Sequence, residues 1–362
     1  SNHTDGFGGI HRIINTDSYN NCDSLSGNPI GSNAGATGNG FAVWSDVTQG
    51  ETYFINCRAW GVSDQGWFIG TDAYVKLENC WSLANKAYVQ GGGGGYKMGW
   101  QRIDVPDLRR EIINCVAAYN DGYGFFTNEN GSGSPPDWYA VRSNHYNNIA
   151  YHNGYTVTSA GFGFIIQNTQ QQDSIQEWRN FSNNINYDNY RSDIFPSAAT
   201  VICSGSNNSW DIPITVADND FISIDSTGMI APRQEDGSLP DNNFYNYFLK
   251  LKPTSNAINA GIDVGLPYIG NAPDLGPFEY NPPSQIIADH TVVDKYDDIP
   301  QRWIDSVKTM WVSYAGESHA AGVRTGMNIL ETLDPTYAVY TQESGTPIGY
   351  TTANLRFNTA TW

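Results

Sequence analysis

The segment Ile55-Asn56-Cys57-Arg58-Ala59-Trp60 returns twice along the chain, as Glu78-Asn79-Cys80-Trp81-Ser82-Leu83 and as Ile113-Asn114-Cys115-Val116-Ala117-Ala118. Looser copies begin at Asn15 and Asn148. A glycine followed by an aromatic residue recurs between the copies, at Gly40-Phe41, Gly66-Trp67, Gly95-Tyr96, Gly124-Phe125 and Gly163-Phe164, with Asp5-Gly6-Phe7 as a further candidate. A period of about 30 residues is typical of solenoid proteins.

Short strands separated by Gly and Asn turns cannot each close a hydrophobic core, so they must stack on their neighbours. We therefore predict an all-β fold in which residues 1 to about 200 form a right-handed parallel β-helix. The Asn-Cys pairs predict an interior cysteine ladder beside asparagines in turns at positive φ. The aromatic residues of the Gly-aromatic pairs predict a stack in the core.

The repeat fades after residue 200, and the rest of the chain falls into two parts. Residues 200–282 stay turn-rich, and we expect them to form the last coils and the C-terminal cap of a domain spanning residues 1–282. Asn281-Pro282-Pro283-Ser284 is typical of a linker. Residues 283–362 then predict a helix near 299–308, a strand near 310–314 and a helix near 320–333. This order indicates the start of an α/β module, which we expect to continue beyond Trp362.

Composition excludes several classes of protein. The chain has 37 acidic and 19 basic residues and a net charge of −18, which argues against nucleic-acid binding. The same charge repels an acidic polysaccharide unless a cation or a local basic patch intervenes. Five cysteines without a CxxC pair argue against a cysteine metal site. No apolar run is long enough for a membrane span, and a start at Ser1 without a signal peptide is expected of a processed or excised piece.

Lys97 is the informative exception in the repeat. It stands in a row that otherwise holds Ala42, Phe68, Phe126 and Ile165, and it follows five glycines, residues 91–95, which we expect to leave open space. A lysine between two phenylalanines is partly desolvated, which lowers its pKa and makes it a usable general base. The alternative is an exposed lysine on an ordinary solenoid face.

Several motifs together resemble the family 9 pectate lyases, which are parallel β-helix polysaccharide lyases, over roughly residues 10–280. The motifs are, in chain order, Asp17-Ser18-Tyr19-Asn20-Asn21, Gly38-Asn39-Gly40-Phe41-Ala42, Cys57-Arg58-Ala59-Trp60, Ser63-Asp64-Gln65-Gly66-Trp67, Asn79-Cys80-Trp81 and Gly95-Tyr96-Lys97-Met98-Gly99. By this resemblance Lys97 falls on the catalytic lysine of the family. The implied reaction is β-elimination on a uronate polymer such as polygalacturonate, carried out by a secreted, bacterial-type enzyme.

The resemblance also implies Ca²⁺, which the family holds with aspartates so that the metal neutralises the uronate carboxylate. Here Asn39 and Gln65 stand at ligand positions, and Asp64 is the carboxylate that is kept. Asp5 is a candidate second carboxylate in the same column. The predicted calcium site therefore consists of Asp64, Asn39, Gln65 and Asp5, with fewer anionic oxygens than a Ca²⁺ ion usually receives.

Two interpretations follow from this departure. In the first, the site acts on another substrate or without metal, with Arg58, Arg102, Arg109 or Arg110 pairing with the uronate carboxylate and Trp67 contacting the sugar. In the second, the β-helix is a non-catalytic glycan-binding or surface-structural module. Its stacking surfaces would then be Trp44, Trp67, Trp81 and Trp100. Both interpretations predict an acidic polysaccharide outside the cell as the partner.

A second resemblance lies in the C-terminal segment. Ala315-Gly316-Glu317-Ser318-His319 resembles the first block of SGNH-type esterases, with Glu317 where that family has Asp. The resemblance implies Ser318 as a nucleophile, assisted by backbone N–H groups of the turn, and a carbohydrate esterase activity on the same glycan. The alternative is an ordinary Gly-Ser turn between a strand and a helix.

Overall fold

The chain divides into two compact units, Ser1–Pro282 and Pro283–Trp362. The computed structural model describes residues 2–5, 9–27, 29–45, 48–99, 107–128, 141–167, 179–198, 203–282, 298–314, 318–342 and 351–358.

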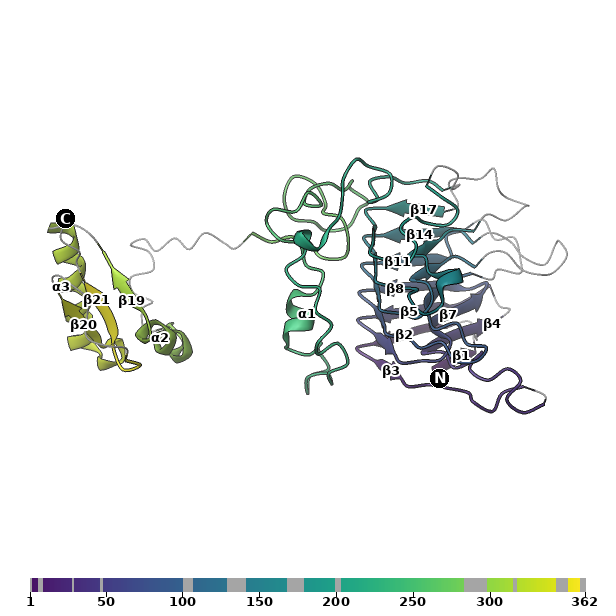
Figure 1. Cartoon of the computed structure of the whole chain (residues 1–362), viewed down its shortest axis with the longest axis horizontal. Coiled ribbons are helices and arrows are strands. Elements are labelled where there is room, and N and C mark those ends of the chain that lie inside the picture. The colour runs from purple at the N-terminus through teal and green to yellow at the C-terminus, as the bar shows by residue number, and fades with distance from the viewer. Residues whose placement is uncertain are drawn as a thin grey trace. The chain divides into compact units, whose positions relative to one another are not determined.

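The first unit is a stack of coils in which each coil contributes one strand to each of three sheets (Figure 1). The first sheet holds β1 (Asn2–Asp5), β4 (Phe41–Ser45), β7 (Gln65–Thr71), β10 (Gly94–Lys97), β13 (Phe125–Phe126) and β16 (Phe164–Ile165). The second holds β2 (Ile10–Ile14), β5 (Glu51–Ile55), β8 (Tyr74–Glu78), β11 (Arg110–Ile113), β14 (Ser143–Tyr146) and β17 (Arg179–Ser182). The third holds β3 (Asp17–Tyr19), β6 (Arg58–Trp60), β9 (Trp81–Leu83), β12 (Val116–Ala118), β15 (Ile149–Tyr151) and β18 (Ile185–Tyr187).

Neighbouring strands in these sheets pair in parallel, as in β4 with β7 and β11 with β14. The predicted parallel β-helix is therefore confirmed. A short strand is stable here because both its backbone edges are satisfied by the coils before and after it.

The predicted aromatic stack is confirmed as the centre of the core. Phe41, Trp67, Tyr96, Phe125 and Phe164 pair in register from coil to coil. Their ring centroids lie 5.0, 4.9, 4.7 and 4.9 Å apart in that order, and the rings are nearly parallel. Each of these side chains is almost completely buried, so the stack contributes both apolar burial and ring packing.

The predicted cysteine ladder is confirmed for Cys57, Cys80 and Cys115, which are fully buried free thiols. Cys22 is exposed and does not belong to the ladder, although it also follows an asparagine. Asn56, Asn79 and Asn114 have φ values of 53°, 55° and 54°, as predicted for the turns.

In later coils asparagines continue the column of the cysteines. The Asn148 side-chain oxygen accepts a 2.9 Å hydrogen bond from the backbone of Cys115, and Asn184 accepts one of 3.0 Å from Asn148. In the looser copy that begins at Asn148, the turn residue with the positive φ is the preceding Asn147, at 56°.

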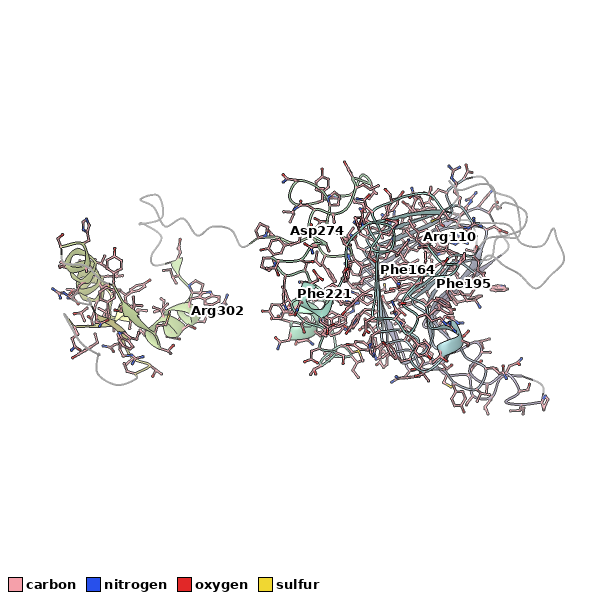
Figure 2. The ribbon with its side chains drawn as sticks, turned by 45° about the horizontal axis from the view of Figure 1, so that its top comes forward. Arg110, Phe164, Phe195, Phe221, Asp274 and Arg302 are labelled. Carbon is pink, nitrogen blue, oxygen red and sulfur yellow. The ribbon has the colours of Figure 1, made fainter. Side chains whose placement is uncertain are left out.

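Residues 203–282 pack against the outside of the third sheet, so most of this segment is a lateral cover and not the expected cap. The segment includes α1 (Asn243–Tyr247) and η3 (Asp218–Asp220), and α1 lies beside the stack of strands (Figure 1). Phe221, Phe244 and Phe248 share a buried cluster with residues of the third sheet, such as Trp81. Figure 2 shows Phe221 in this cover and Phe164 within the strand stack. Only the first residues act as a cap, where Trp210 packs 5.0 Å from Phe164.

The second unit has the predicted order of helix, strand and helix. It contains α2 (Gln301–Lys308), β19 (Trp311–Ser313), α3 (Ser318–Leu333), η5 (Pro335–Tyr337), β20 (Val339–Gln342) and β21 (Leu355–Asn358). Its three strands are parallel in the order β19-β21-β20. Within the described ranges, no helix combines the length and apolar character needed to cross a bilayer.

Candidate active site

Lys97 ends β10 on the first sheet and lies in register with Phe68 of β7 and Phe126 of β13. Phe68 is in turn in register with Ala42, and Phe126 with Ile165. The row predicted from the repeat is therefore present in the structure. Since the preceding residue Tyr96 points into the core, alternation places Lys97 on the outer face of the sheet.

The surroundings of Lys97 are mostly aromatic. Its Nζ atom lies 5.3 Å from the centroid of the Phe68 ring, and Phe68 stacks on Trp44 at 5.4 Å. On the other side of Lys97, Phe126 meets Tyr123 edge to face at 5.0 Å. Burial lowers the pKa of Lys97, and the charge of Asp64 acts in the opposite direction. A lysine with a lowered pKa provides more of the neutral amine at a given pH, which is the form that accepts a proton.

Asp64 lies immediately before β7 and is 9% exposed. Its Oδ1 atom accepts a 2.6 Å hydrogen bond from Nε2 of Gln65 and a 3.2 Å bond from the backbone N–H of Gly92. Burial raises the pKa of Asp64, while the Gly92 bond and the charge of Lys97 act to lower it. Asp64 and Lys97 are thus electrostatically coupled, and the carboxylate is held by donors of the protein itself.

Gln65 has both ends of its side-chain amide engaged. Its nitrogen donates to Asp64, and its oxygen accepts from the Tyr123 hydroxyl. Tyr123 reaches Gln65 from two coils away because Gly94 lies between them without a side chain. A Cβ atom at Gly94 would lie 2.3 Å from the Gln65 oxygen and 2.7 Å from the Tyr123 ring. Tyr123 has no signal in the sequence, since nothing in the repeat relates it to Gln65.

The glycine run does not leave the open space that was expected. A Cβ atom at Gly91 would lie 2.0 Å from the carbonyl oxygen of Ser63, and one at Gly95 would lie 2.2 Å from that of Gly124. Gly93 also has a positive φ of 56°. Gly91, Gly93 and Gly95 are required for the close approach of neighbouring coils, so the open space expected at these three positions is filled by the protein itself.

The predicted calcium ligands do not fit a calcium ion. Gln65 presents a nitrogen donor to Asp64, and the side-chain oxygen of Asn39 already accepts a 3.2 Å hydrogen bond from the Gln65 backbone. Ca²⁺ takes six to eight oxygen ligands, several of them usually carboxylates. Among the described residues, no group of three or more His, Cys, Asp or Glu side chains could hold a metal ion.

Asp5 is not in the predicted column. Asp5 pairs with Trp44, whereas Asn2 pairs with Phe41, so the chain register differs from the one assumed for Asp5-Gly6-Phe7. Asn39 lies two residues before Phe41, in a different row from Asp5. The prediction that Asp5 supplies a second carboxylate beside Asn39 and Gln65 is therefore wrong.

The predicted substrate-binding arginines have other roles. Arg58 is fully buried in the third sheet, where its Nε donates a 2.9 Å hydrogen bond to Asp17 and its Nη1 donates one of 2.7 Å to the Tyr245 hydroxyl. Arg110 is also fully buried, donates to backbone carbonyls such as that of Ala73, and has its pKa lowered by burial to about 9. The substrate role predicted for Arg58 is therefore wrong, and Arg110 has no access to a polymer.

Arg109 and Arg102 differ from the buried arginines. Arg109 donates a 3.3 Å hydrogen bond to the Thr48 carbonyl and lies 3.7 Å from the carboxylate of Asp107. Arg102 lies outside the described residues. The substrate-binding roles of Arg109 and Arg102 stay predictions.

The prediction that Trp67 and Trp81 offer stacking surfaces to a sugar is wrong, because both side chains are buried. Trp67 belongs to the core stack, and Trp81 packs against the lateral cover. Trp44 is half-buried beside Phe68, and Trp100 lies outside the described residues. In the described part of the chain, Phe68 and Phe126 flank Lys97, with Trp44 against Phe68 and Tyr123 against Phe126.

Ser318 is the exposed first residue of α3 in the second unit, and β19 precedes it in the chain. Residues 315–317, which complete the SGNH-like motif, lie outside the described residues. His319 is also exposed at the start of the helix. A serine in this position is compatible with the predicted turn from strand to helix, and it does not distinguish a nucleophile from an ordinary turn residue.

Comparison with known proteins identifies the family of the first unit. The family described as "Pel9A-like, right handed beta helix region" matches residues 2–191. The chain belongs to this Pel9A-like family. The family description also supplies the right-handed winding that was predicted from the repeat.

Relatives of this Pel9A-like chain are named as lyases. It is 29% identical over 282 residues to pectate lyase L of Dickeya dadantii (strain 3937), covering 76% of this chain and 57% of that protein. It is 30% identical over 282 residues to pectate lyase L of Dickeya chrysanthemi, with the same coverage. The crystal structure of pectate lyase Pel9A superimposes with a TM-score of 0.55 and 26% identity, over 75% of this chain and 59% of that one. The Pel9A-like chain thus spans little more than half the length of these relatives.

Proposed function

We propose that the β-helix is an extracellular polysaccharide lyase that cleaves a uronate-containing, pectin-like polymer by β-elimination, with Lys97 as the base. The observation that carries the proposal is the place of Lys97, a partly desolvated amine on the outer face of a Pel9A-like β-helix, in register with Phe68 and Phe126. The names of the pectate lyase relatives support the same class of reaction.

In the proposed step, the neutral amine of Lys97 removes the proton from C5 of the uronate. The electron pair of that C–H bond forms the C4–C5 double bond, and the C4–O bond breaks. The negative charge of Asp64 acts on Lys97, so it stabilises the ammonium that forms. Phe68 and Trp44 offer an apolar surface on which a sugar ring can pack.

The test is the release of unsaturated product, followed by its ultraviolet absorbance, from a panel of uronate polymers. We expect Lys97→Ala to lower kcat/KM by about a hundredfold to about ten-thousandfold, which is the usual contribution of a general base. Lys76→Ala is the matched control, because Lys76 lies on the second sheet and pairs with Glu78 at 3.0 Å. Absence of product from every polymer, with glycan binding retained, would instead establish a non-catalytic binding module.

For the second unit we propose ester hydrolysis by Ser318, in keeping with the SGNH resemblance. The proposal rests on that resemblance, and it requires an accessible Ser318, which is exposed at the start of the 16-residue helix α3. The N-terminus of a helix favours an oxyanion. Release of acetate from an acetylated polysaccharide by the full chain, lost in Ser318→Ala and kept in Ser306→Ala, is the expected result. Equal activity in the two variants would contradict the assignment.

A further inference from the structure

The charges around Lys97 bear on which form of the substrate the site accepts. Lys97 acts as a base only as the neutral amine, and in that form it offers no positive charge to a substrate carboxylate. Asp64, which is 9% exposed, adds a negative charge that acts on Lys97. A free uronate carboxylate would therefore meet repulsion and no counter-ion from these two residues.

The position expected for a neutralising cation is taken by protein donors. The Gln65 amide nitrogen lies 2.6 Å from Oδ1 of Asp64, and the Gly92 N–H binds the same oxygen. The Tyr123 hydroxyl holds the opposite end of the Gln65 amide, so this orientation of the amide is the one that satisfies both partners. Within this network, Oδ1 of Asp64 and both ends of the Gln65 amide are engaged by groups of the protein.

Among the described residues, the arginines predicted to pair with the uronate carboxylate do not supply a positive charge for it either. Arg58 and Arg110 are fully buried and bonded inside the protein. Arg109 is engaged by Thr48 and Asp107.

The surface beside Lys97 is apolar. Phe68, Phe126 and Trp44 form it and are partly exposed, whereas Ala42 and Ile165 of the same row are buried. An apolar surface disfavours a desolvated carboxylate and accommodates a methyl group.

We propose that the Lys97 site takes a uronate whose carboxyl group is esterified, and that it works without calcium. This inference rests on the proposed lyase function and specifies its substrate. An ester is neutral before the reaction and draws the negative charge of the reacting C5 onto its carbonyl oxygen. The elimination of the ester then passes through an enolate with a single negative charge. The same step on a free carboxylate would form a dianion, which requires a cation to neutralise it.

The atoms balance with water as the only co-reactant. The Lys97 amine takes the C5 proton and becomes an ammonium, and the electron pair of the C5–H bond moves into the enolate of the ester. The enolate then forms the C4–C5 double bond while the C4–O bond breaks. The departing glycosidic oxygen takes a proton from water, the Lys97 ammonium returns its proton to the resulting hydroxide, and the ester is unchanged.

The experiment compares highly methyl-esterified polygalacturonate with the same polymer after complete de-esterification, using the full chain in EDTA and in added calcium. We expect unsaturated product from the esterified polymer at a rate at least about tenfold higher than from the free acid, and equal rates with EDTA and calcium. Faster cleavage of the free acid, or a requirement for calcium, would overturn the inference.

A binding measurement separates this inference from the lyase proposal. Lys97→Ala, which removes the base, is titrated with esterified and free-acid oligogalacturonates of equal length by calorimetry. Tighter binding of the ester by about tenfold supports the inference even if neither polymer is cleaved, in which case the lyase proposal fails alone. Equal or tighter binding of the free acid, or no binding of the ester, overturns the inference.

Asp64→Asn tests the stated cause of the preference. The asparagine oxygen can still accept from Gln65, so the network persists while the charge is removed. We expect the ratio of ester to free-acid cleavage, or of their affinities in the Lys97→Ala background, to fall by severalfold. An unchanged ratio contradicts the role assigned to Asp64.

Discussion

The side-chain amide of Gln65 donates a 2.6 Å hydrogen bond to the carboxylate of Asp64, at the position where the related lyases were expected to hold calcium. This contact turns the one carboxylate of the predicted metal site into part of a hydrogen-bond network with Tyr123. It also leaves Asp64 as the anion coupled to Lys97. The Gln65 amide nitrogen therefore occupies a carboxylate oxygen that the predicted metal site would have used.

Calcium should not stabilise the protein. A ligand that binds the folded state raises the melting temperature, and we expect the same Tm in excess EDTA and in millimolar calcium. The double variant Asn39→Asp, Gln65→Asp, which restores two carboxylates beside Asp64, should gain calcium-dependent stabilisation. Differential scanning calorimetry measures both proteins. A calcium-dependent Tm in the unmodified chain that is abolished by Asp64→Asn would contradict the structure of the site.

Cleavage should rise with pH through the titration of Lys97. Burial lowers the pKa of this amine from its ordinary value of 10.5, so the rising limb of kcat/KM should have its midpoint below that value. Asp64→Asn removes a charge that favours the ammonium, and the midpoint should therefore move to still lower pH. The pH profiles of the two proteins on one polymer test this. A shift toward higher pH in Asp64→Asn would show that the carboxylate does not act on Lys97.

Acid should destabilise the β-helix through His145. Its ring stacks on Phe181 at 4.2 Å inside the solenoid, and burial lowers its pKa to about 3 from 6.5. The unfolded chain binds a proton below pH 6.5 and the folded chain does not, so stability falls as the pH drops toward 3, by at most about 1.4 kcal/mol per pH unit.

The variant His145→Phe should remove this dependence, because Phe54 and Phe181 fill equivalent interior positions of the same sheet. Chemical denaturation at several pH values provides the measurement. An equal acid sensitivity in the variant would assign it to other groups.

The lateral cover should depend on Asp17. The Asp17 carboxylate pairs with the buried Arg58 and with Arg233, which donates to it at 2.8 Å. Asp17→Asn leaves the buried Arg58 charge without its anion, and we expect a loss of about 3 kcal/mol in the free energy of unfolding. Glu78→Gln is the control, since the partly exposed pair with Lys76 should contribute less than about 1 kcal/mol. Similar losses in the two variants would contradict the importance of the buried pair.

The cysteine ladder should be chemically inert. Cys22 is exposed, whereas Cys57, Cys80 and Cys115 are buried. The pKa of Cys57 is raised, first by the neighbouring Cys80 thiol, and that of Cys80 is raised by burial, so neither forms the reactive thiolate readily. Ellman's reagent should label Cys22 rapidly in the native protein and the ladder only after unfolding. Mass spectrometry of the labelled peptides identifies each site.

The sequence alone determined the structural features that recur with each copy of the repeat. The stacked aromatics, the turn asparagines and the row containing Lys97 recur once per coil, and parallel strands bring equivalent positions of successive coils into register. Alternation along each strand also separates the inward Trp67 from the outward Phe68. Each of these positions can be predicted from the repeat, because the equivalent residues of the neighbouring coils lie directly beside it.

Only the tertiary structure decided the contacts that do not recur from coil to coil. Arg58 is buried because Tyr245 and the rest of the cover, far away in the sequence, lie against the third sheet, and nothing in the repeat specifies that packing. Gln65 meets Tyr123 because Gly94 leaves room for one side chain to span two coils. Such contacts depend on the shapes of particular side chains in three dimensions, and the contact between Gln65 and Tyr123 fixes how Gln65 binds Asp64, whose charge acts on Lys97.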